Sequence, residues 1–204
     1  MLKYIADKEH YTEVLSRCGS VKHDLWIATA DLKDLYVGMG NGRDAEPFLA
    51  VLDRLLRRGV EVRLLHAKEP GENFRQDFDR YPGLWSKLDR RLCLRVHFKI
   101  MIFDCSTAYI GSANLTGAGM GMKSSDGRNF EAGILTDDPA LVDAYRRRSL
   151  VLGKEISILS PGKEPETAEA VDLAPDFSTI SRSFFGFSSM GQGCIMLLLK
   201  GWPS

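Results

Sequence analysis

Hydrophobic and polar positions follow two alternating periods along the first half of the chain. Residues 25–30, LWIATA, and residues 60–67, VEVRLLHA, are short apolar runs typical of buried strands. Between them, residues 46–59 repeat apolar side chains at helical spacing before a glycine. The shared face of this helix is formed by Phe48, Val51, Leu52 and Leu55, and the expected stop is Gly59. The order strand, helix, strand is typical of α/β folds.

The second half of the chain continues this alternation with one long strand candidate. Residues 92–104, LCLRVHFKIMIFD, follow a polar stretch and a short predicted helix, and they form the longest predicted strand. Shorter strands are predicted at 107–111, TAYIG, and at 129–135, NFEAGIL. Asp138 and Pro139 then begin a predicted helix, with the aspartate as its cap. We therefore predict an α/β fold with a mixed β-sheet flanked by helices on both faces.

The character of the sequence changes after residue 159. The stretch 160–178, SPGKEPETAEAVDLAPDFS, carries three of the eight prolines of the chain and several acidic residues. We predict one domain over residues 1–159 and a loosely ordered tail over 160–204. The apolar run at 194–199 is far shorter than the roughly 18 to 20 residues that a membrane span needs.

Composition narrows the class of protein without identifying a partner. The 204 residues are 44% hydrophobic and 26% charged, which fits one globular domain with a substantial core. Basic and acidic residues balance at 27 each, so the net charge indicates neither a nucleic acid nor a membrane as partner. With no signal-peptide or transmembrane segment, we predict a cytoplasmic protein. The four cysteines are scattered without the spacing of zinc ligands, and we expect no metal or other cofactor.

A histidine and a lysine interrupt the longest predicted strand. His97 and Lys99 are two residues apart, so a continuous strand would place both on one face, roughly 6 to 7 Å apart. The opposite face would carry four apolar side chains, Val96, Phe98, Ile100 and Ile102. A neutral imidazole can attack phosphorus or pass a proton, and an ammonium group can hold a phosphate oxygen. This pair therefore favours chemistry on a phosphodiester.

Polar residues after the next predicted strand extend this pattern. Gly111 permits a tight turn, and the Ser112 hydroxyl and the Asn114 amide can donate hydrogen bonds to an anionic oxygen. Glu131, on the following predicted strand, is expected to accept a hydrogen bond from one ring nitrogen of His97. Asp104, at the end of the strand with His97, is expected to have a structural role.

The loop 117–128, GAGMGMKSSDGR, is either a lid or an ordinary long loop. As a lid it would bring Lys123 and Arg128 to a phosphate.

These residues carry a resemblance to a known family. The series His97, Lys99, Asp104, the Gly111 to Asn114 turn and Glu131 resembles the HKD motif of the phospholipase D superfamily. The series spans about 35 residues, which makes it far more specific than an isolated His-X-Lys. A weaker similarity covers roughly residues 20–150. The sequence most resembles stand-alone phospholipase D-like proteins of bacteria, which implies a phospholipase D-like αβα sandwich.

The resemblance implies a metal-independent reaction in two steps, through a phosphohistidine intermediate. One histidine attacks phosphorus and a second protonates the leaving oxygen, so two motifs are needed for each active site. This chain has one complete motif, and single-motif members of the superfamily form homodimers with the active site at the twofold interface. His66, in His66-Ala67-Lys68, is an alternative source of the second histidine within one chain.

Three classes of function stay open on sequence alone. Hydrolysis of nucleic acid, DNA or RNA, is the leading interpretation, because small single-motif members of the superfamily are often nucleases. The second is a phospholipase or phosphatidyltransferase acting on phospholipid head groups. The third is a non-catalytic binding module, which would have no need to keep the set His97, Lys99, Asn114 and Glu131.

Overall fold

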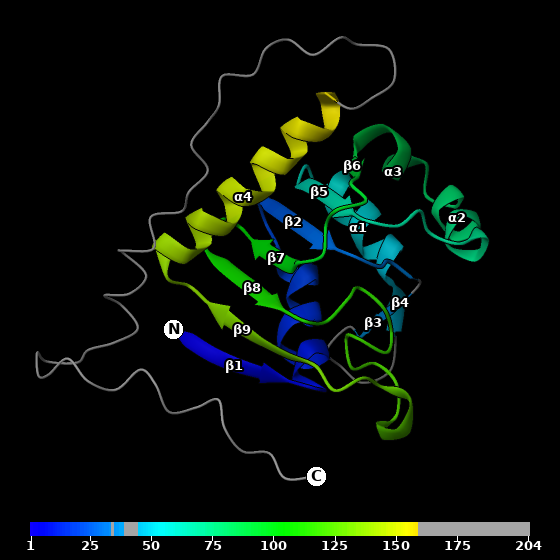
Figure 1. Cartoon of the computed structure of the whole chain (residues 1–204). Coiled ribbons are helices and arrows are strands. Elements are labelled where there is room, and N and C mark those ends of the chain that lie inside the picture. The colour runs from blue at the N-terminus through cyan, green and yellow to red at the C-terminus, as the bar shows by residue number, and fades with distance from the viewer. Residues whose placement is uncertain (34, 39–44, 159–204) are drawn as a thin grey trace, which may run out of the picture. The chain divides into compact units, whose positions relative to one another are not determined.

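The computed structural model describes residues 1–33, 35–38 and 45–158, which all lie within one compact unit, Met1–Glu164 (Figure 1). The predicted tail, residues 160–204, lies outside the described residues, so its loose order stays a prediction. Among the described residues, no helix has the length and apolar character that crossing a bilayer requires.

A seven-stranded sheet forms the centre of this unit (Figure 1). In spatial order its strands are β1 (Leu2–Ala6), β9 (Ala132–Thr136), β8 (Thr107–Gly111), β7 (Lys99–Phe103), β2 (Asp24–Thr29), β5 (Glu61–His66) and β6 (Asp89–Leu92). The pairs β2–β5 and β5–β6 are parallel, and all other neighbours are antiparallel. The predicted mixed sheet is confirmed. A separate two-stranded sheet pairs β3 (Tyr36–Gly38) with β4 (Ala45–Pro47).

Helices cover both faces of the large sheet, as predicted. Figure 1 shows α4 (Pro139–Ile158) crossing one face, where it packs on the smaller apolar cluster through Val142. The larger apolar cluster fills the other face. It is covered by η1 (His10–Val14), η2 (Leu15–Ser20), α1 (Phe48–Arg57), α2 (Glu72–Asp79) and α3 (Pro82–Lys87). A short 3₁₀ turn, η3 (Ser125–Gly127), lies in the β8–β9 connection.

Local sequence signals explain where two of the helices begin and end. The four apolar side chains of the α1 stripe are all buried, and Gly59 follows the helix with a φ of 83°, a conformation that glycine adopts without steric cost. At the start of α4, Asp138 Oδ1 accepts hydrogen bonds from the backbone N–H groups of Ala140 at 2.9 Å and Leu141 at 3.1 Å. Both helix boundaries follow from the predicted signals.

The longest predicted strand is wrong in one respect that matters for the site. Residues 92–104 divide into the last residue of β6, an irregular connection over 93–98, and β7, which begins at Lys99. His97 therefore lies in the connection and not in a strand. The predicted apolar face is confirmed, because Val96, Ile100 and Ile102 are buried in one cluster and Phe98 packs against it.

The opposite side of β7 is also covered, contrary to the prediction that this face is left for chemistry. Met101 and Phe103 lie on the same side as Lys99 and belong to the larger apolar cluster. The side that was expected to be left for chemistry is therefore core along most of the strand. Only the Lys99 end of β7 reaches the sheet edge.

The β7–β8 turn contains two non-glycine residues with positive φ. These are Asp104, with a φ of 51°, and Cys105, with a φ of 47°. The Asp104 carboxylate accepts hydrogen bonds from the backbone N–H groups of His23 at 2.7 Å and Lys22 at 3.0 Å, and more weakly from Asp24. Partial burial raises the pKa of Asp104, but these backbone bonds outweigh it and leave the pKa below its usual value. Asp104 thus ties this turn to the start of β2.

Candidate active site

The residues predicted to carry chemistry meet at one edge of the large sheet. In the β7–β8 register Lys99 lies opposite Gly111, and in the β8–β9 register Gly111 lies opposite Gly133. On the other side of β7, Ile100 lies opposite Ala28, one residue before the end of β2. The starts of β7 and β9 therefore lie beside the ends of β8 and β2. The sheet topology brings segments from four strands to a common edge.

His97 and Lys99 occupy different environments at this edge. The His97 side chain is exposed, and its ring forms no hydrogen bond with any residue that the structure describes. Lys99 is buried, with 8% of its surface exposed, and its Nζ donates a 2.7 Å hydrogen bond to the backbone carbonyl of His97. The Lys99 ammonium group therefore contacts the backbone of the residue that carries the imidazole, although His97 does not lie on a strand.

The Lys99 ammonium group has no counter-ion within the described part of the chain. No carboxylate oxygen there lies within 4.0 Å of its Nζ, and its hydrogen bond is to an uncharged carbonyl. Burying a charge without a partner is costly, so residues in this state usually have a ligand or a reaction to serve. The site therefore has the electrostatic character of an anion-binding site.

The segment after β2 holds Asn114 in a defined orientation. The backbone N–H of Asp31 donates a 3.2 Å hydrogen bond to Asn114 Oδ1. A backbone N–H requires an acceptor, so the amide oxygen faces Asp31 and the amide N–H₂ group is left to donate elsewhere. Neither Asp31 nor Thr29, two residues earlier in the chain, was predicted to belong to the site, although a threonine at the end of a buried apolar strand was a visible signal.

Gly111 is required by the packing beneath the turn. A Cβ added at this position would overlap the Tyr109 hydroxyl and lie 2.6 Å from the Ala132 carbonyl oxygen. Gly133, its partner across the strand pair, is also crowded by the Tyr109 ring. The two glycines therefore let a buried tyrosine lie directly under the β8–β9 pair.

Ser112 and Glu131 bond to each other in the structure. The Ser112 hydroxyl donates to Glu131 Oε2 and accepts a 3.1 Å hydrogen bond from the Ala132 N–H. Glu131 Oε1 accepts a 3.0 Å hydrogen bond from the side-chain amide of Asn129. The expected bond between Glu131 and the His97 ring is not among these contacts. Glu131 also precedes β9 and does not lie within it.

The β8–β9 connection is anchored at one end and exposed at the other. Leu115 and Met120 are buried in the larger cluster, so the first part of the connection is packed. Lys123 is exposed and Arg128 is half-exposed, and neither side chain has a hydrogen bond or an ion pair among the described residues. Both cations therefore lie on a loop that leads from Asn114 to Glu131, with charge available for a ligand.

The alternative histidine, His66, is committed to structural contacts. Its ring is fully buried, with Nδ1 2.7 Å from the Lys68 carbonyl oxygen, and Nε2 accepts a 3.0 Å hydrogen bond from Arg90 Nε. Arg90 also bonds Glu69 at 2.8 Å. Burial lowers the pKa of His66, and the charge of Arg90 acts in the same direction. With both ring nitrogens engaged, His66 has no nitrogen to offer a substrate in this conformation.

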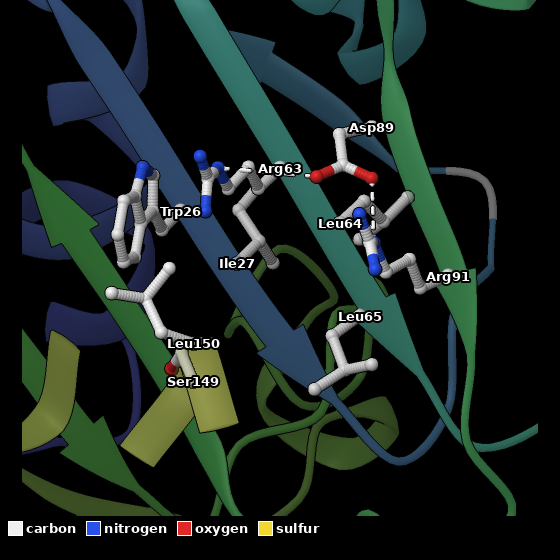
Figure 2. A pocket seen from close by; sticks show the side chains of 9 residues that line it. All are labelled: Trp26, Ile27, Arg63, Leu64, Leu65, Asp89, Arg91, Ser149 and Leu150. Carbon is white, nitrogen blue, oxygen red and sulfur yellow. Dashed lines mark hydrogen bonds and ion pairs between the residues drawn. The ribbon is translucent and has the colours of Figure 1, made fainter. Parts of the chain in front are cut away.

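The larger of two described cavities lies away from the candidate site. Its volume is about 290 Å³, and it lies on the α4 side of the sheet, lined by residues that include Trp26, Leu65 and Leu150. Figure 2 shows Asp89 between Arg63 and Arg91, and the Arg63 guanidinium lies 4.5 Å from the centre of the Trp26 ring. None of the predicted site residues lines this cavity, so we place the chemistry at the sheet edge.

The described residues at this edge include no cluster of metal-ligating side chains. In the parts of the chain that the structure describes, no three His, Cys, Asp or Glu side chains are grouped so that they could bind one metal ion.

Comparison with known families gives one match over most of the described chain. A family model described as "Cardiolipin synthase, PLD-like domain" matches residues 15–149. This range contains His97, Lys99, Asn114 and Glu131. No protein among curated sequences matches the chain significantly.

Several solved structures are similar in fold. NucT from Helicobacter pylori has a TM-score of 0.53 and 15% identity, and the match covers 76% of this chain and 97% of that one. Nuc from Salmonella typhimurium, a phospholipase D family member, has a TM-score of 0.53 and 18% identity, covering 76% and 94%. TrmBL2, an archaeal chromatin protein with a novel mode of DNA binding, has a TM-score of 0.53 and 12% identity, covering 76% and 52%. At these identities the similarity concerns the fold.

Proposed function

The chain belongs to the phospholipase D superfamily, and we propose that it is a metal-independent phosphodiesterase. The proposed reaction passes through a phosphohistidine intermediate, and the proposed substrate is nucleic acid. One observation carries this proposal. The buried ammonium group of Lys99, which has no counter-ion among the described residues, bonds to the backbone carbonyl of His97, whose exposed imidazole has no hydrogen bond in the same part of the chain. A phosphodiester supplies both the negative charge that the first lacks and the electrophile that the second can attack.

The proposed reaction has two displacements. The His97 ring attacks phosphorus, so that an N–P bond forms while the bond from phosphorus to the leaving oxygen breaks. A second imidazole gives its proton to that oxygen. It then removes a proton from water, whose oxygen attacks phosphorus and breaks the N–P bond. Lys99 and the Asn114 amide N–H₂ group stabilise the non-bridging oxygens in both steps.

A second copy of the chain is the proposed source of the second imidazole. Within one chain, His66 is buried and uses both ring nitrogens, whereas His97 lies exposed at a sheet edge. A twofold axis near this edge would bring His97 of one subunit and His97 of the partner subunit to opposite sides of one phosphorus atom. In that assembly we assign Glu131 to orient an imidazole, after exchange of its bond with Ser112.

Two cations on the β8–β9 connection support nucleic acid as the substrate. Lys123 and Arg128 lack partners among the described residues and lie on the loop between Asn114 and Glu131. A polymer with a phosphate at each nucleotide can contact such a loop while another phosphate occupies the site. Ser112 is assigned to the same binding role, as a hydrogen-bond donor to a phosphate oxygen.

A phospholipid is the second candidate substrate, and a specific observation favours it. Phe130 is 97% exposed next to Glu131, and Leu94 is 79% exposed in the connection that leads to His97. Exposed apolar side chains on the segments that carry site residues can insert into a lipid surface. The matching family model is also described by the name of a lipid enzyme, cardiolipin synthase.

One experiment separates these candidates. The purified full-length chain is incubated in EDTA with single-stranded DNA, double-stranded DNA, RNA and labelled phospholipid vesicles in parallel, with His97→Ala as the control. We expect cleavage of a nucleic acid in EDTA, and none with the variant. Cleavage of the lipid alone would select the second candidate. Strict dependence on added metal ion, or no cleavage of any substrate, would overturn the proposed reaction.

A further inference from the structure

We infer that Thr29 is a positioning residue for Asn114, and this inference rests on the proposed function of the same site. Thr29 is the last residue of β2 and is 1% exposed. Its buried hydroxyl connects the end of β2 to the turn that carries the Asn114 amide.

The Thr29 hydroxyl uses both its donor and its acceptor capacity in this connection. It donates a 2.8 Å hydrogen bond to the Asp31 carbonyl oxygen and accepts a 3.0 Å hydrogen bond from the Leu115 N–H. It also lies 3.4 Å from Asn114 Oδ1. One side chain thus bonds both to Asp31 and to the residue after Asn114, on either side of the contact between the Asp31 N–H and Asn114 Oδ1.

Further backbone contacts show that Thr29 closes a continuous network. The Lys33 N–H donates a 3.0 Å hydrogen bond to the Leu115 carbonyl oxygen, and Leu32 pairs with Leu115 as a parallel bridge. Leu115 is therefore held on its N–H side by Thr29 and on its carbonyl side by Lys33. Removal of the Thr29 hydroxyl would leave the Leu115 N–H buried without a partner, which is the costly way to break a hydrogen bond.

Thr29 also lies close to the charged part of the site. It lines a small cavity of about 10 Å³ together with Lys99, Ala113 and Leu115. This volume is at the lower limit for one water molecule, so a misplaced turn has little free space into which it could relax. The structure therefore assigns to Thr29 the task of holding the Asn114 amide donor at a fixed position relative to the Lys99 ammonium group.

The chain offers a matched control at the other end of the sheet. Thr136, at the end of β9, is fully buried and also forms two such bonds. Its hydroxyl donates to the Met1 carbonyl oxygen at 3.1 Å and accepts from the Asp138 N–H at 3.1 Å. Thr136→Val therefore removes the same group from a similar environment, far from the site.

The test compares Thr29→Val, Thr29→Ser and Thr136→Val with the unaltered protein. Hydrolysis of a small activated phosphodiester is measured in EDTA, well below each melting temperature. We expect Thr29→Val to lower kcat about 10-fold or more with KM changed less than about 2-fold, because a small misplacement of a donor acts mainly on the transition state. Thr29→Ser should restore most of kcat, and Thr136→Val should keep it within about 2-fold.

A second measurement does not depend on activity. Amide hydrogen exchange at Leu115 should be faster in Thr29→Val than in the unaltered protein, and unchanged in Thr29→Ser and Thr136→Val. Equal kcat losses in Thr29→Val and Thr136→Val, or no rescue by serine, would overturn the inference. An inactive unaltered protein would overturn the proposed function instead, and exchange at Leu115 would then decide whether Thr29 holds the turn.

Discussion

Lys99 Nζ donates a 2.7 Å hydrogen bond to the backbone carbonyl oxygen of His97. The contact ties the lysine side chain to the backbone of the residue that carries the exposed imidazole, although His97 lies outside the strand. Val96, one residue earlier, is buried and anchors the same connection. Residues 93–98, which lead to β7, are thus held by two contacts: the burial of Val96 and the bond from Lys99 to the His97 carbonyl oxygen.

Lys99→Met should separate activity from stability. The variant keeps the apolar stem and removes a buried charge that has no counter-ion among the described residues. We expect phosphodiesterase activity to fall by about 10²-fold or more, as with the loss of other donors to a developing anion. The melting temperature should stay the same or rise, because the cost of burying the charge disappears. Lys87→Met, at an exposed position, is the control for both measurements.

Mixtures of subunits should reveal whether two copies build one site. Unaltered chains are mixed with His97→Ala chains under conditions that allow subunit exchange, at constant total protein. If each site needs His97 from both subunits, activity follows the square of the unaltered fraction, and an equal mixture keeps about one quarter of the full activity. A linear dependence, with about half of the activity in the equal mixture, would show that one chain is sufficient. Light scattering on the same samples reports the mass of the assembly.

Acid should weaken the fold through His66. Burial lowers its pKa below the ordinary value of 6.5. Between these two pKa values the unfolded chain binds more protons at this residue than the folded chain does, so the free energy of unfolding falls as pH falls through about 6.5. This contribution is fully present above that pH. Urea unfolding at pH 8, 7, 6 and 5 should show a steeper loss in the unaltered protein than in His66→Asn. Equal slopes would contradict this assignment.

Gly111→Ala should destabilise the protein through the contact beneath the turn. The added Cβ would overlap the Tyr109 hydroxyl, and the Ala132 carbonyl oxygen at 2.6 Å cannot yield without moving β9. We expect a loss of about 1 to 3 kcal/mol in the free energy of unfolding, typical of overpacking in a close-packed interior. Gly19→Ala is the matched control, because nothing lies within 4 Å of its Cβ position. Equal effects of the two substitutions in thermal unfolding would refute the packing argument.

Much of the fold could be predicted because strong local signals coincide with tertiary packing. The strands 25–30, 60–67 and 107–111 are short apolar runs that the structure places in the sheet as β2, β5 and β8. The Asp138 cap likewise marks the start of α4. The superfamily predicted from the motif is confirmed by the family match and the similar folds.

The remaining features depend on contacts that no local pattern encodes. β1 was missed because a five-residue edge strand with only Ile5 buried has little apolar signal. The break between β6 and β7 was missed because residues 93–98 keep strand-like alternation while they cross from the end of one strand to the start of another. The bond between Ser112 and Glu131, and the role of Thr29, arise only when distant segments meet at the sheet edge.

The turn at Asp104 and Cys105, both with positive φ, determines the pairing register of β7 and β8 as far as the opposite end of the hairpin. It sets the alignment in which Phe103 faces Thr107 and, four residues further, Lys99 faces Gly111. Because side chains alternate across a strand, a slip by one residue would carry the lysine to the α4 side and leave the imidazole without its cation. A corner roughly 17 Å along the strand from Lys99, at about 3.3 Å per residue, thus selects the side of the sheet on which this buried lysine lies.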